Sequence, residues 1–585
     1  MKITKILTVA AVALGAMVAL SGCIRETFPK TSTITQEQLM GGQMDIVAEN
    51  LLKGIPRGVL APAYGGWDHS DFGFPSVGVF NDQAAQLICT NGWLMGNAPG
   101  YNRFLMGAWG KGYGSSGYMP VQFWYTYYPQ IKSCNDVVVL TAGNDNLKSY
   151  SAIARTYRAS FYLDLARAFE ALPVYAGDLG NSGSYDDACL NVAGLTVPIV
   201  NEFTDESAAK NNPRVTREEL FTFIFSDLEY AVEAFSSADY VPNGTTDPTL
   251  AVVYGLYARA YLWLGGFEDG LNGELPEGKA AYAKAAEYAQ MAIAAFGGAV
   301  MTEDEWTNPI TGFNTKASSW MWTLQHSTDT IAGNLHQFSA HMCPEAAYGY
   351  GPLTNPGVSS KAYERLGNGD FRKKLMIDPA HFSTQWNEEL QQDVFIADEE
   401  LAKVAWDAFK PYTTITSFEE FCSYAPYTFF KFRPGQGNRT DFMTAGAIAI
   451  PMMRCEEMYF IDMEATFHTQ GADAAMQQLT QFIRQNRNSS YSINTQDILD
   501  EIIFQKGIEF WGEGVVMYDM KRLNKGVTCA YEGTSYDPQR RFNSTGRLPW
   551  WTPMFPEFET QVNLGIPADK NNPDPTDVYI AIQEL

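Results

Sequence analysis

The segment 147–173 restricts the possible folds of this chain more than any other stretch. Pro173 ends the segment, because proline lacks the N–H that the next helical turn would use. The apolar residues before it recur every three or four positions, which is the period of one helical face; they are Leu147, Tyr150, Ala154, Tyr157, Phe161, Leu165, Phe169 and Leu172. A helix with such a face must bury it, so the sequence predicts a core of several packed helices.

Other segments support a helical core. Thr216 and Glu219 have the spacing of a capping box at the start of another amphipathic segment. Residues 250–264 and 280–296 predict a pair of helices that each end at two glycines, and their sequence resembles a tetratricopeptide repeat unit with an insertion. We therefore predict an all-α dominated fold built from tetratricopeptide-like helical repeats.

Three regions lack the helical period, near residues 54–120, 181–212 and 306–450. In the first region, Gly, Asn and Pro alternate with large aromatic residues. A long segment of this kind is either a functional loop or a poorly ordered one, and its aromatic content favours order. We predict that the three regions are irregular insertions in a single body that spans residues 23–585.

The amino terminus has the pattern of a lipoprotein signal peptide. Lys2 and Lys5 precede an apolar run, and small residues then lead to Cys23. Small residues before a Cys suit a lipoprotein signal peptidase, and the thiol accepts the lipid. The apolar run is shorter than the ~20 residues that span a bilayer. We expect residues 1–22 to be removed and lipidated Cys23 to be the only attachment to the membrane.

Charge and cysteine content exclude several classes of function. The 585 residues have a formal net charge of −25, and loss of Lys2 and Lys5 with the signal peptide would make it −27. A charge of this sign repels phosphates, which argues against a nucleic-acid partner. Of the eight cysteines, seven remain once Cys23 is lipidated, and this odd, scattered set argues against a disulfide framework. No CxxC spacing indicates zinc, and the sequence predicts no metal and no cofactor.

Several motifs follow one another along the chain in the order that one known family has. They are a W-x3-Y-x2-I-x3-N helix at 124–135, the run RASFYLDLARAFEALPVY at 158–175, the run RCEEMYFIDMEA at 454–465, and the spacing of Glu509, Glu513, Gly514 and Asp519. Together they resemble the SusD/RagB family of outer-membrane nutrient-binding lipoproteins over nearly the whole mature chain. Gln505 and Lys506 stand where that family has Glu-Arg, and Val516 stands where it has Arg, which puts local ion pairs in doubt.

The resemblance implies both an architecture and a function. The large irregular regions would pack on one face of the repeats. The protein would be a surface-exposed outer-membrane lipoprotein that binds oligosaccharides without catalysis and passes them to a partner TonB-dependent transporter. Some members of the family handle peptides, so a peptide ligand is the alternative. A secreted glycoside hydrolase and a purely structural scaffold are the remaining rivals.

Aromatic residues indicate where a sugar could bind. A sugar ring has an apolar face of C–H bonds and a rim of hydroxyls, so a flat aromatic ring with amides and carboxylates beside it can hold the sugar. In characterised relatives the ligand site lies on loops of the first and third irregular regions. The residues of those loops that offer this combination are Trp67, Asp68, Asp71, Asn91, Trp93, Trp320, Trp322, Tyr348 and Tyr350. We predict that they form the ligand site.

Motifs for catalysis or metal binding are weak. Residues 112–117 fit GxGxxG, but no predicted strand precedes them and Pro120 interrupts the segment that follows. His326, His336 and His341 match no metal-binding spacing. The sequence has no GxSxG or HExxH motif, although it leaves open a glycosidase pair among its 66 carboxylates.

Overall fold

The computed structural model describes residues 44–63, 69–90, 112–174, 183–237, 239–267, 275–388, 392–536, 540–576 and 578. By its internal contacts the chain divides into residues 1–47 and residues 48–585. The second unit contains the hydrophobic core. No helix in the described ranges is both long enough and apolar enough to cross a membrane.

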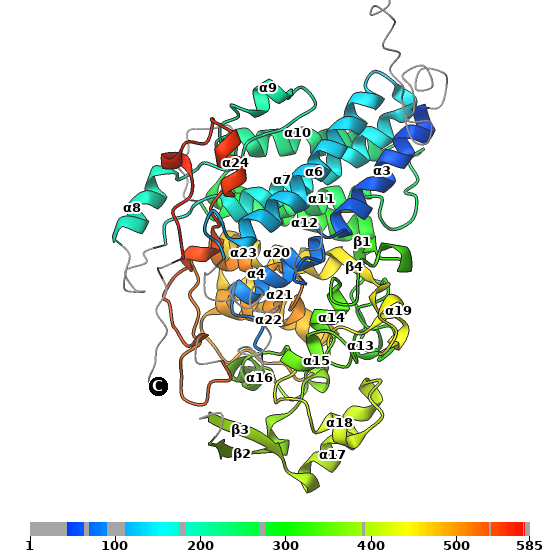
Figure 1. Ribbon diagram of the computed structural model, residues 1–585, viewed down its shortest axis with the longest axis vertical. Coiled ribbons are helices and arrows are strands. Elements are labelled where there is room, and N and C mark those ends of the chain that lie inside the picture. The colour runs from blue at the N-terminus through cyan, green and yellow to red at the C-terminus, as the bar shows by residue number, and fades with distance from the viewer. Residues whose placement is uncertain are drawn as a thin grey trace, which may run out of the picture. The chain divides into compact units, whose positions relative to one another are not determined.

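Helices dominate the second unit. The helices that build its packed body are α3 (Met44–Leu60), which begins in the first unit, α4 (Phe74–Ala84), α6 (Tyr118–Thr141), α7 (Lys148–Phe169), α10 (Arg217–Phe235), α11 (Leu250–Gly265), α12 (Gly278–Phe296), α20 (Cys455–Gln470), α21 (Ala472–Asn486), α22 (Ile498–Glu509) and the short α23 (Val516–Arg522). From α6 to α12 these long helices pack side by side, α6 on α7, α7 on α10, α10 on α11 and α11 on α12 (Figure 1). α12 packs in turn on α20, which contacts α21 and α22. The predicted all-α dominated fold is confirmed, while the assignment of its helices to tetratricopeptide-like repeats stays a prediction.

Shorter elements connect the long helices. The helices are α8 (Gly183–Asn191), α9 (Glu206–Ala209), α13 (Glu303–Thr307), α14 (Phe338–Met342), α15 (Gly351–Thr354), α16 (Ser360–Arg365), α17 (Glu399–Phe409), α18 (Phe418–Phe421), α19 (Phe442–Gly446) and α24 (Glu557–Val562). The strands are β1 (Trp320–Gln325), β2 (Phe382–Asn387), β3 (Gln392–Ala397) and β4 (Ala449–Arg454). Strand β1 pairs antiparallel with the distant β4, and β2 pairs antiparallel with β3.

Helix α7 occupies most of the segment that the sequence singles out. Of the eight apolar residues predicted to form its face and the turn after it, seven are buried and Tyr150 is half-buried. The helix ends at Phe169, earlier than predicted, because Glu170 takes an extended conformation. Arg158 is fully buried on the same helix and pairs with Asp227 at 2.7 Å. The apolar face therefore lies in the core, and one of its charges is neutralised there.

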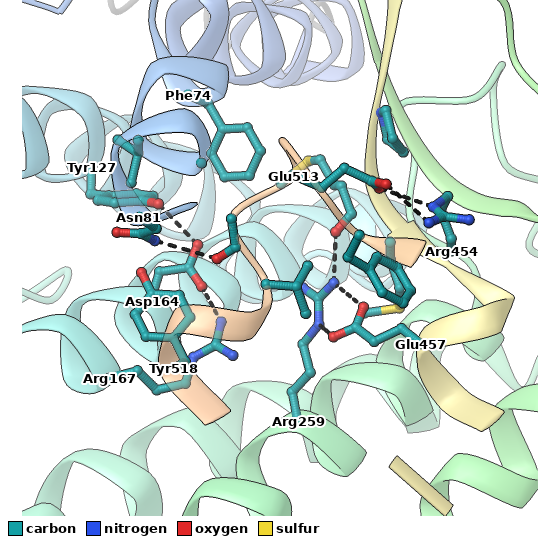
Figure 2. Close-up of a pocket in the computed structure, with 18 residues that line it drawn as sticks. Phe74, Asn81, Tyr127, Asp164, Arg167, Arg259, Arg454, Glu457, Glu513 and Tyr518 are labelled. Carbon is teal, nitrogen blue, oxygen red and sulfur yellow. Dashed lines mark hydrogen bonds and ion pairs between the residues drawn. The ribbon is translucent and has the colours of Figure 1, made fainter. Parts of the chain in front are cut away.

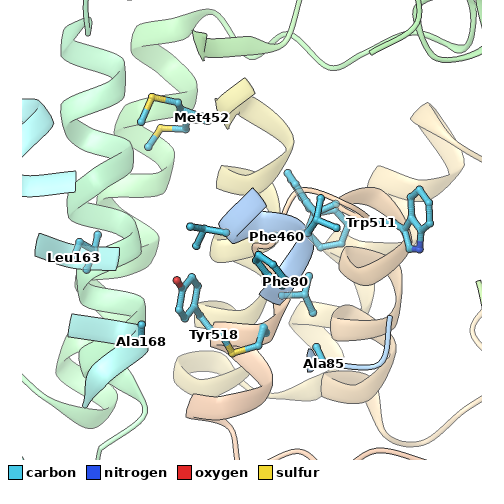
Figure 3. Close-up of a cluster of buried hydrophobic side chains, with 14 of the residues drawn as sticks. Phe80, Ala85, Leu163, Ala168, Met452, Phe460, Trp511 and Tyr518 are labelled. Atoms are coloured by element: carbon cyan, nitrogen blue, oxygen red, sulfur yellow. The ribbon is translucent and has the colours of Figure 1, made fainter. Parts of the chain in front are cut away.

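The core joins helices that lie far apart in the sequence. Phe80 of α4, Leu163 of α7, Phe460 of α20 and Tyr518 of α23 are all buried in one cluster (Figure 3). Burial of a large apolar side chain stabilises a fold by roughly 1.5–3 kcal/mol. The cluster thus holds the carboxy-terminal helices against the helices of the first half of the chain.

The residues predicted to begin α10 and to end α12 do so in the structure. Thr216 accepts a hydrogen bond from the backbone N–H of Glu219, and the Glu219 side chain accepts one from the backbone N–H of Thr216, which completes the capping box of α10. Gly297 ends α12 in the left-handed conformation at φ 93°. Only glycine adopts this conformation without a steric penalty, so the glycine pair is a sound stop signal.

Parts of the predicted irregular regions are regular. α3 continues to Leu60 and α4 lies wholly inside 54–120. Nine of the eleven α4 residues are buried, including several polar ones. A helix that is buried on all sides has no single apolar face, so its sequence lacks the helical period. The region 306–450 likewise contains all four strands except the last residues of β4.

Candidate functional site

The two tryptophans predicted to contact ligand in the third irregular region lie in the core. Trp320 and Trp322 belong to β1 and are both 0% exposed. Trp322 donates from Nε1 to the carbonyl oxygen of Thr246 at 2.8 Å and packs against the ring of Tyr157. A ligand has no access to a ring that is buried in this way. Their assignment to the ligand site is corrected, because pairing with β4 places β1 in the core.

Asp71 also serves the fold. Its side chain is fully buried, and Oδ1 accepts hydrogen bonds from the backbone N–H of Ala63 at 2.7 Å and from Nε2 of Gln122 at 3.1 Å. These bonds connect the segments on both sides of residues 64–68 and attach them to α6. The prediction that Asp71 bonds to ligand is corrected, because its carboxylate satisfies buried protein donors.

The remaining predicted site residues fall into two groups. Trp67, Asp68, Asn91 and Trp93 lie outside the described residues, as does the lipidation residue Cys23, so their roles stay predictions. Tyr348 and Tyr350 are half-buried on the segment between α14 and α15.

Tyr350 connects the two loop regions that the sequence predicts to form the site. Its hydroxyl shares a hydrogen bond of 2.6 Å with Nδ1 of His69, a residue 281 positions away in the chain. The hydroxyl of Tyr348 lies 3.1 Å from Oγ of Ser339. Because His69 directly follows residues 64–68, the structure brings the first irregular region beside Tyr350.

Three histidines lie beside this contact; His69 and His336 are half-buried, and His341 is fully buried. The rings of His69 and His336 meet edge to face at 5.2 Å, and the ring of His341 lies 5.4 Å from that of Tyr350. We call the group the histidine–tyrosine cluster; its members are His69, His336, His341, Tyr348 and Tyr350. Their spacing carried no signal, because His69 reaches the others only through the fold.

The cluster offers groups that form hydrogen bonds. Nε2 of His341 donates to the carbonyl oxygens of His69 and Leu335 at 2.8 and 2.9 Å, which places the proton of this ring on Nε2. Within the described ranges, no three His, Cys, Asp or Glu residues are arranged to hold a metal ion. The cluster therefore presents aromatic rings, imidazole nitrogens and phenol hydroxyls.

A separate feature of the structure is a small charged cavity lined by residues of α4, α7, α11 and α23, among others (Figure 2). Its volume is about 50 Å³, which holds a few waters, since one water needs roughly 10–15 Å³. The charges in its wall are already paired: Arg259 binds Glu457 at 2.6 Å, and Arg454 binds Glu513 at 2.9 Å. This cavity is too small for a sugar ring and has its ionic groups satisfied.

Arg454 and Glu513 in the wall of this cavity belong to a buried ionic network, which we call the charged junction. Its members are the motif residues Arg454, Glu456, Glu509 and Glu513, together with Arg372, Lys431 and Arg487. Glu509 accepts hydrogen bonds from Arg372, Arg454 and Arg487 at 2.9–3.1 Å. Burial raises the pKa of the Glu509 carboxyl, but Arg487 and the other two guanidinium groups outweigh burial and leave this pKa below its usual value. The Glu509 carboxylate is therefore ionised and is paired with three guanidinium groups in the core.

Two of the residues that depart from the family's pattern, Gln505 and Lys506, have polar partners in the structure. Lys506 donates to Asp519 at 2.6 Å, so a lysine forms the ion pair in place of arginine. Gln505 accepts from Arg372 at 2.7 Å and donates to Glu501 at 2.9 Å. Val516 is buried among apolar side chains. At these positions other contacts therefore replace the ion pairs that the family's residues would form.

Comparisons with known proteins agree with this architecture. Residues 382–553 match the model of the SusD family. A SusD-like carbohydrate binding protein from Bacteroides vulgatus has 18% identity and a TM-score of 0.62, over 89% of this chain and 97% of the other. The fold is SusD-like. No curated protein matches the chain.

Other SusD-like structures match over a similar length. A SusD superfamily protein from Bacteroides thetaiotaomicron has 18% identity and a TM-score of 0.61, over 91% of this chain and 99% of its own. Surface glycan-binding protein A from the same species, solved with laminarihexaose, has 15% identity and a TM-score of 0.56, over 90% and 99%. The predicted resemblance to the SusD/RagB family is confirmed.

Proposed function

We propose that this SusD-like chain binds oligosaccharides at the cell surface without hydrolysing them. The observation that carries the proposal is the contact between Tyr350 and His69, which gathers rings and hydrogen-bonding groups from two regions 281 residues apart. A protein of the same fold that was solved with laminarihexaose supports a glycan as the ligand class.

In this proposal the two tyrosines, His69 and His336 supply the rim of the site. Tyr348 and Tyr350 are half-buried, so each keeps part of its ring accessible. Trp67 and Trp93 are proposed as the flat platforms for the sugar ring, with Asp68 and Asn91 as hydrogen-bonding neighbours. A carrier must also release its ligand, so we expect a Kd of roughly micromolar to millimolar, or about 4–8 kcal/mol.

The proposed fate of the ligand is transfer to a partner TonB-dependent transporter in the outer membrane. Lipidated Cys23 would hold the chain at that membrane, since acyl chains provide the hydrophobic attachment. Radiolabelled palmitate should enter the wild-type chain, and Cys23→Ala should release the protein from the membrane fraction. Absence of label in the wild-type chain would refute the anchor.

A glycan array followed by calorimetry tests the ligand. Tyr350→Ala should weaken binding of the best neutral oligosaccharide about tenfold, because it removes a ring and the bond to His69. The matched control is Phe203→Ala, which removes an aromatic ring that is 85% exposed on another segment, before α9. Full affinity in Tyr350→Ala would show that the glycan binds at another site. Binding of peptides alone would favour the peptide ligand, and release of reducing sugar would support a glycoside hydrolase.

A further inference from the structure

Two open pockets lie side by side on the segment 363–378, away from the histidine–tyrosine cluster residues. The first pocket, of about 430 Å³, lies between this segment and α17. The second, of about 440 Å³, lies between it and residues 488–501. Both volumes are in the range of roughly 300–1,000 Å³ that small-ligand sites have. Asn368 lines both pockets, so they are two halves of one depression, which we call the Asn368 groove.

The first half has an apolar floor and a phenol ring at its rim. The floor consists of buried Met376, Ile377, Phe409 and Phe421. Tyr412, the last residue of the 3-10 turn Lys410–Tyr412, is half-buried beside them. An aromatic ring next to aliphatic side chains offers the C–H contacts that a sugar face uses.

The cations at the rim of the first half are already engaged. Nζ of Lys373 donates to the carbonyl oxygen of Leu366 and to Oδ1 of Asn368, each at 3.0 Å. Nζ of Lys374 pairs with Glu303 at 2.5 Å. An anionic ligand would have to displace these partners, so the half favours a neutral ligand.

His381 adds a polar atom that still needs a partner. Its Nδ1 is buried at the edge of the first half and has no hydrogen-bond partner among the described residues. Burial lowers the pKa of His381, so this ring is neutral at pH 7 and can exchange a hydrogen bond with a hydroxyl.

The second half is lined by amides and hydroxyls. They belong to Asn368, Asn488, Ser490, Ser492, Asn494 and Thr495. Each amide both donates and accepts, and each hydroxyl does the same, which matches the hydroxyl rim of a sugar. Glu364, Arg365 and Glu501 also line this half, and Arg365 pairs with Glu501 at 2.6 Å and with Asp500 at 2.8 Å.

Two glycines, one on either side of Asn368, leave room for the side chain of Asn488. A Cβ atom on Gly369 would lie 2.6 Å from Oδ1 of Asn488 and 2.7 Å from Oγ of Ser490, and one on Gly367 would lie 3.1 Å from Nδ2 of Asn488. Glycine at these two positions therefore permits the close approach of Asn488.

We propose that the Asn368 groove is a second glycan-binding site, which takes a neutral oligosaccharide strand with one ring against Tyr412 and the next among the amides and hydroxyls around Asn488. The class of ligand rests on the proposed function, but the location does not depend on the histidine–tyrosine cluster. A strand of linked rings fits both halves, because each ring carries an apolar face and a hydroxyl rim.

Amide hydrogen exchange and calorimetry test the groove, with laminarihexaose and the best neutral oligosaccharide of the array as probes. The full chain should show slower exchange in residues 364–376 and 488–497 on addition of a probe, and calorimetry should give two sites. The double variant Tyr412→Ala/Asn494→Ala should lose this protection and one of the two sites. Tyr412→Phe/Asn494→Ala, which keeps the ring, should retain part of the affinity.

The outcomes separate the two proposals. Unchanged protection in the double variant, or one site in the wild type that Tyr350→Ala removes, overturns the groove while glycan binding stands. Protection of the groove segments that survives in Tyr350→Ala supports the groove even if the histidine–tyrosine cluster binds nothing. Protection by peptides alone overturns the groove as a glycan site, and no binding of any oligosaccharide overturns both proposals.

Discussion

The charged junction and the histidine–tyrosine cluster are built from opposite kinds of side chain. In the junction, buried carboxylates and guanidinium groups pair with one another, and little space remains beside them. In the cluster, His69, His336 and the two tyrosines are half-buried, and the Tyr350 hydroxyl shares a single hydrogen bond with Nδ1 of His69. The motif residues that carry the family resemblance therefore stabilise the fold, whereas the residues proposed to bind a ligand lie outside those motifs.

Among the variants that test this comparison, Glu509→Ala should lose the most folding stability. The change leaves the guanidinium groups of Arg372, Arg454 and Arg487 with reduced compensation in the core, and breaking such a buried pair costs about 3–5 kcal/mol. Urea unfolding should show this loss. Glu399→Ala, on the exposed side of α17, is the control and should change stability by less than about 0.5 kcal/mol. A loss below about 1 kcal/mol in Glu509→Ala would mean that the junction is not a stabilising centre.

Glu513→Ala should have a smaller effect on the same network. Glu513 accepts from Lys431 at 2.6 Å and from Arg454 at 2.9 Å. Lys431 keeps the carbonyl oxygens of Glu509 and Trp511, and Arg454 keeps Glu509, so the expected loss is about 1–3 kcal/mol. Thermal unfolding measures it, and an unchanged Tm would contradict the role of this carboxylate.

Asp82, near the charged junction, makes folding stability depend on pH. Burial raises the pKa of Asp82 to about 7, although hydrogen bonds from the backbone of Gly514 and Gly512 oppose the shift. Between about pH 4, near the ordinary pKa of an aspartate, and pH 7 the folded chain binds more protons than the unfolded chain, so this group's contribution to stability falls as pH rises.

Asp82→Asn tests that dependence, because an amide oxygen can still accept from Gly512 but does not titrate in this range. Relative to the wild type, the variant should gain on the order of 1–2 kcal/mol between pH 5 and pH 7. Urea unfolding at the two pH values measures the gain. Parallel pH profiles for the two proteins would show that Asp82 keeps an ordinary pKa.

The smallest expected effect on stability belongs to the cluster. Tyr350→Phe removes only the hydroxyl that bonds to His69, which should cost about 0.5–1.5 kcal/mol of local hydrogen bonding. Because the ring is half-buried and outside the ionic network, Tm should move less than in Glu513→Ala, while calorimetry should detect weaker glycan binding. A larger fall in Tm with full binding would make the cluster a structural element and erase the contrast.

Local patterns predicted much of the helical fold. The face of α7 and the capping box at Thr216 are set by residues within a few turns of one another, so their spacing is visible in the chain. Helix α4 was missed because it is buried on all sides and has no apolar stripe. The motif around Glu509 predicted the family, although its ionic partners come from segments as far away as Arg372.

Sequence alone determined most of the long helical segments and the motif order that resembles the SusD/RagB family, because helical period, caps and motif spacing are local. Only the tertiary structure decided which aromatic rings are accessible. The sequence predicted both Trp320 and Tyr350 as site residues. Pairing with β4 places β1, and with it Trp320, in the core, whereas Tyr350 lies half-buried against His69. The burial of a side chain depends on its contacts with segments far away in the sequence, and no local pattern reveals those contacts.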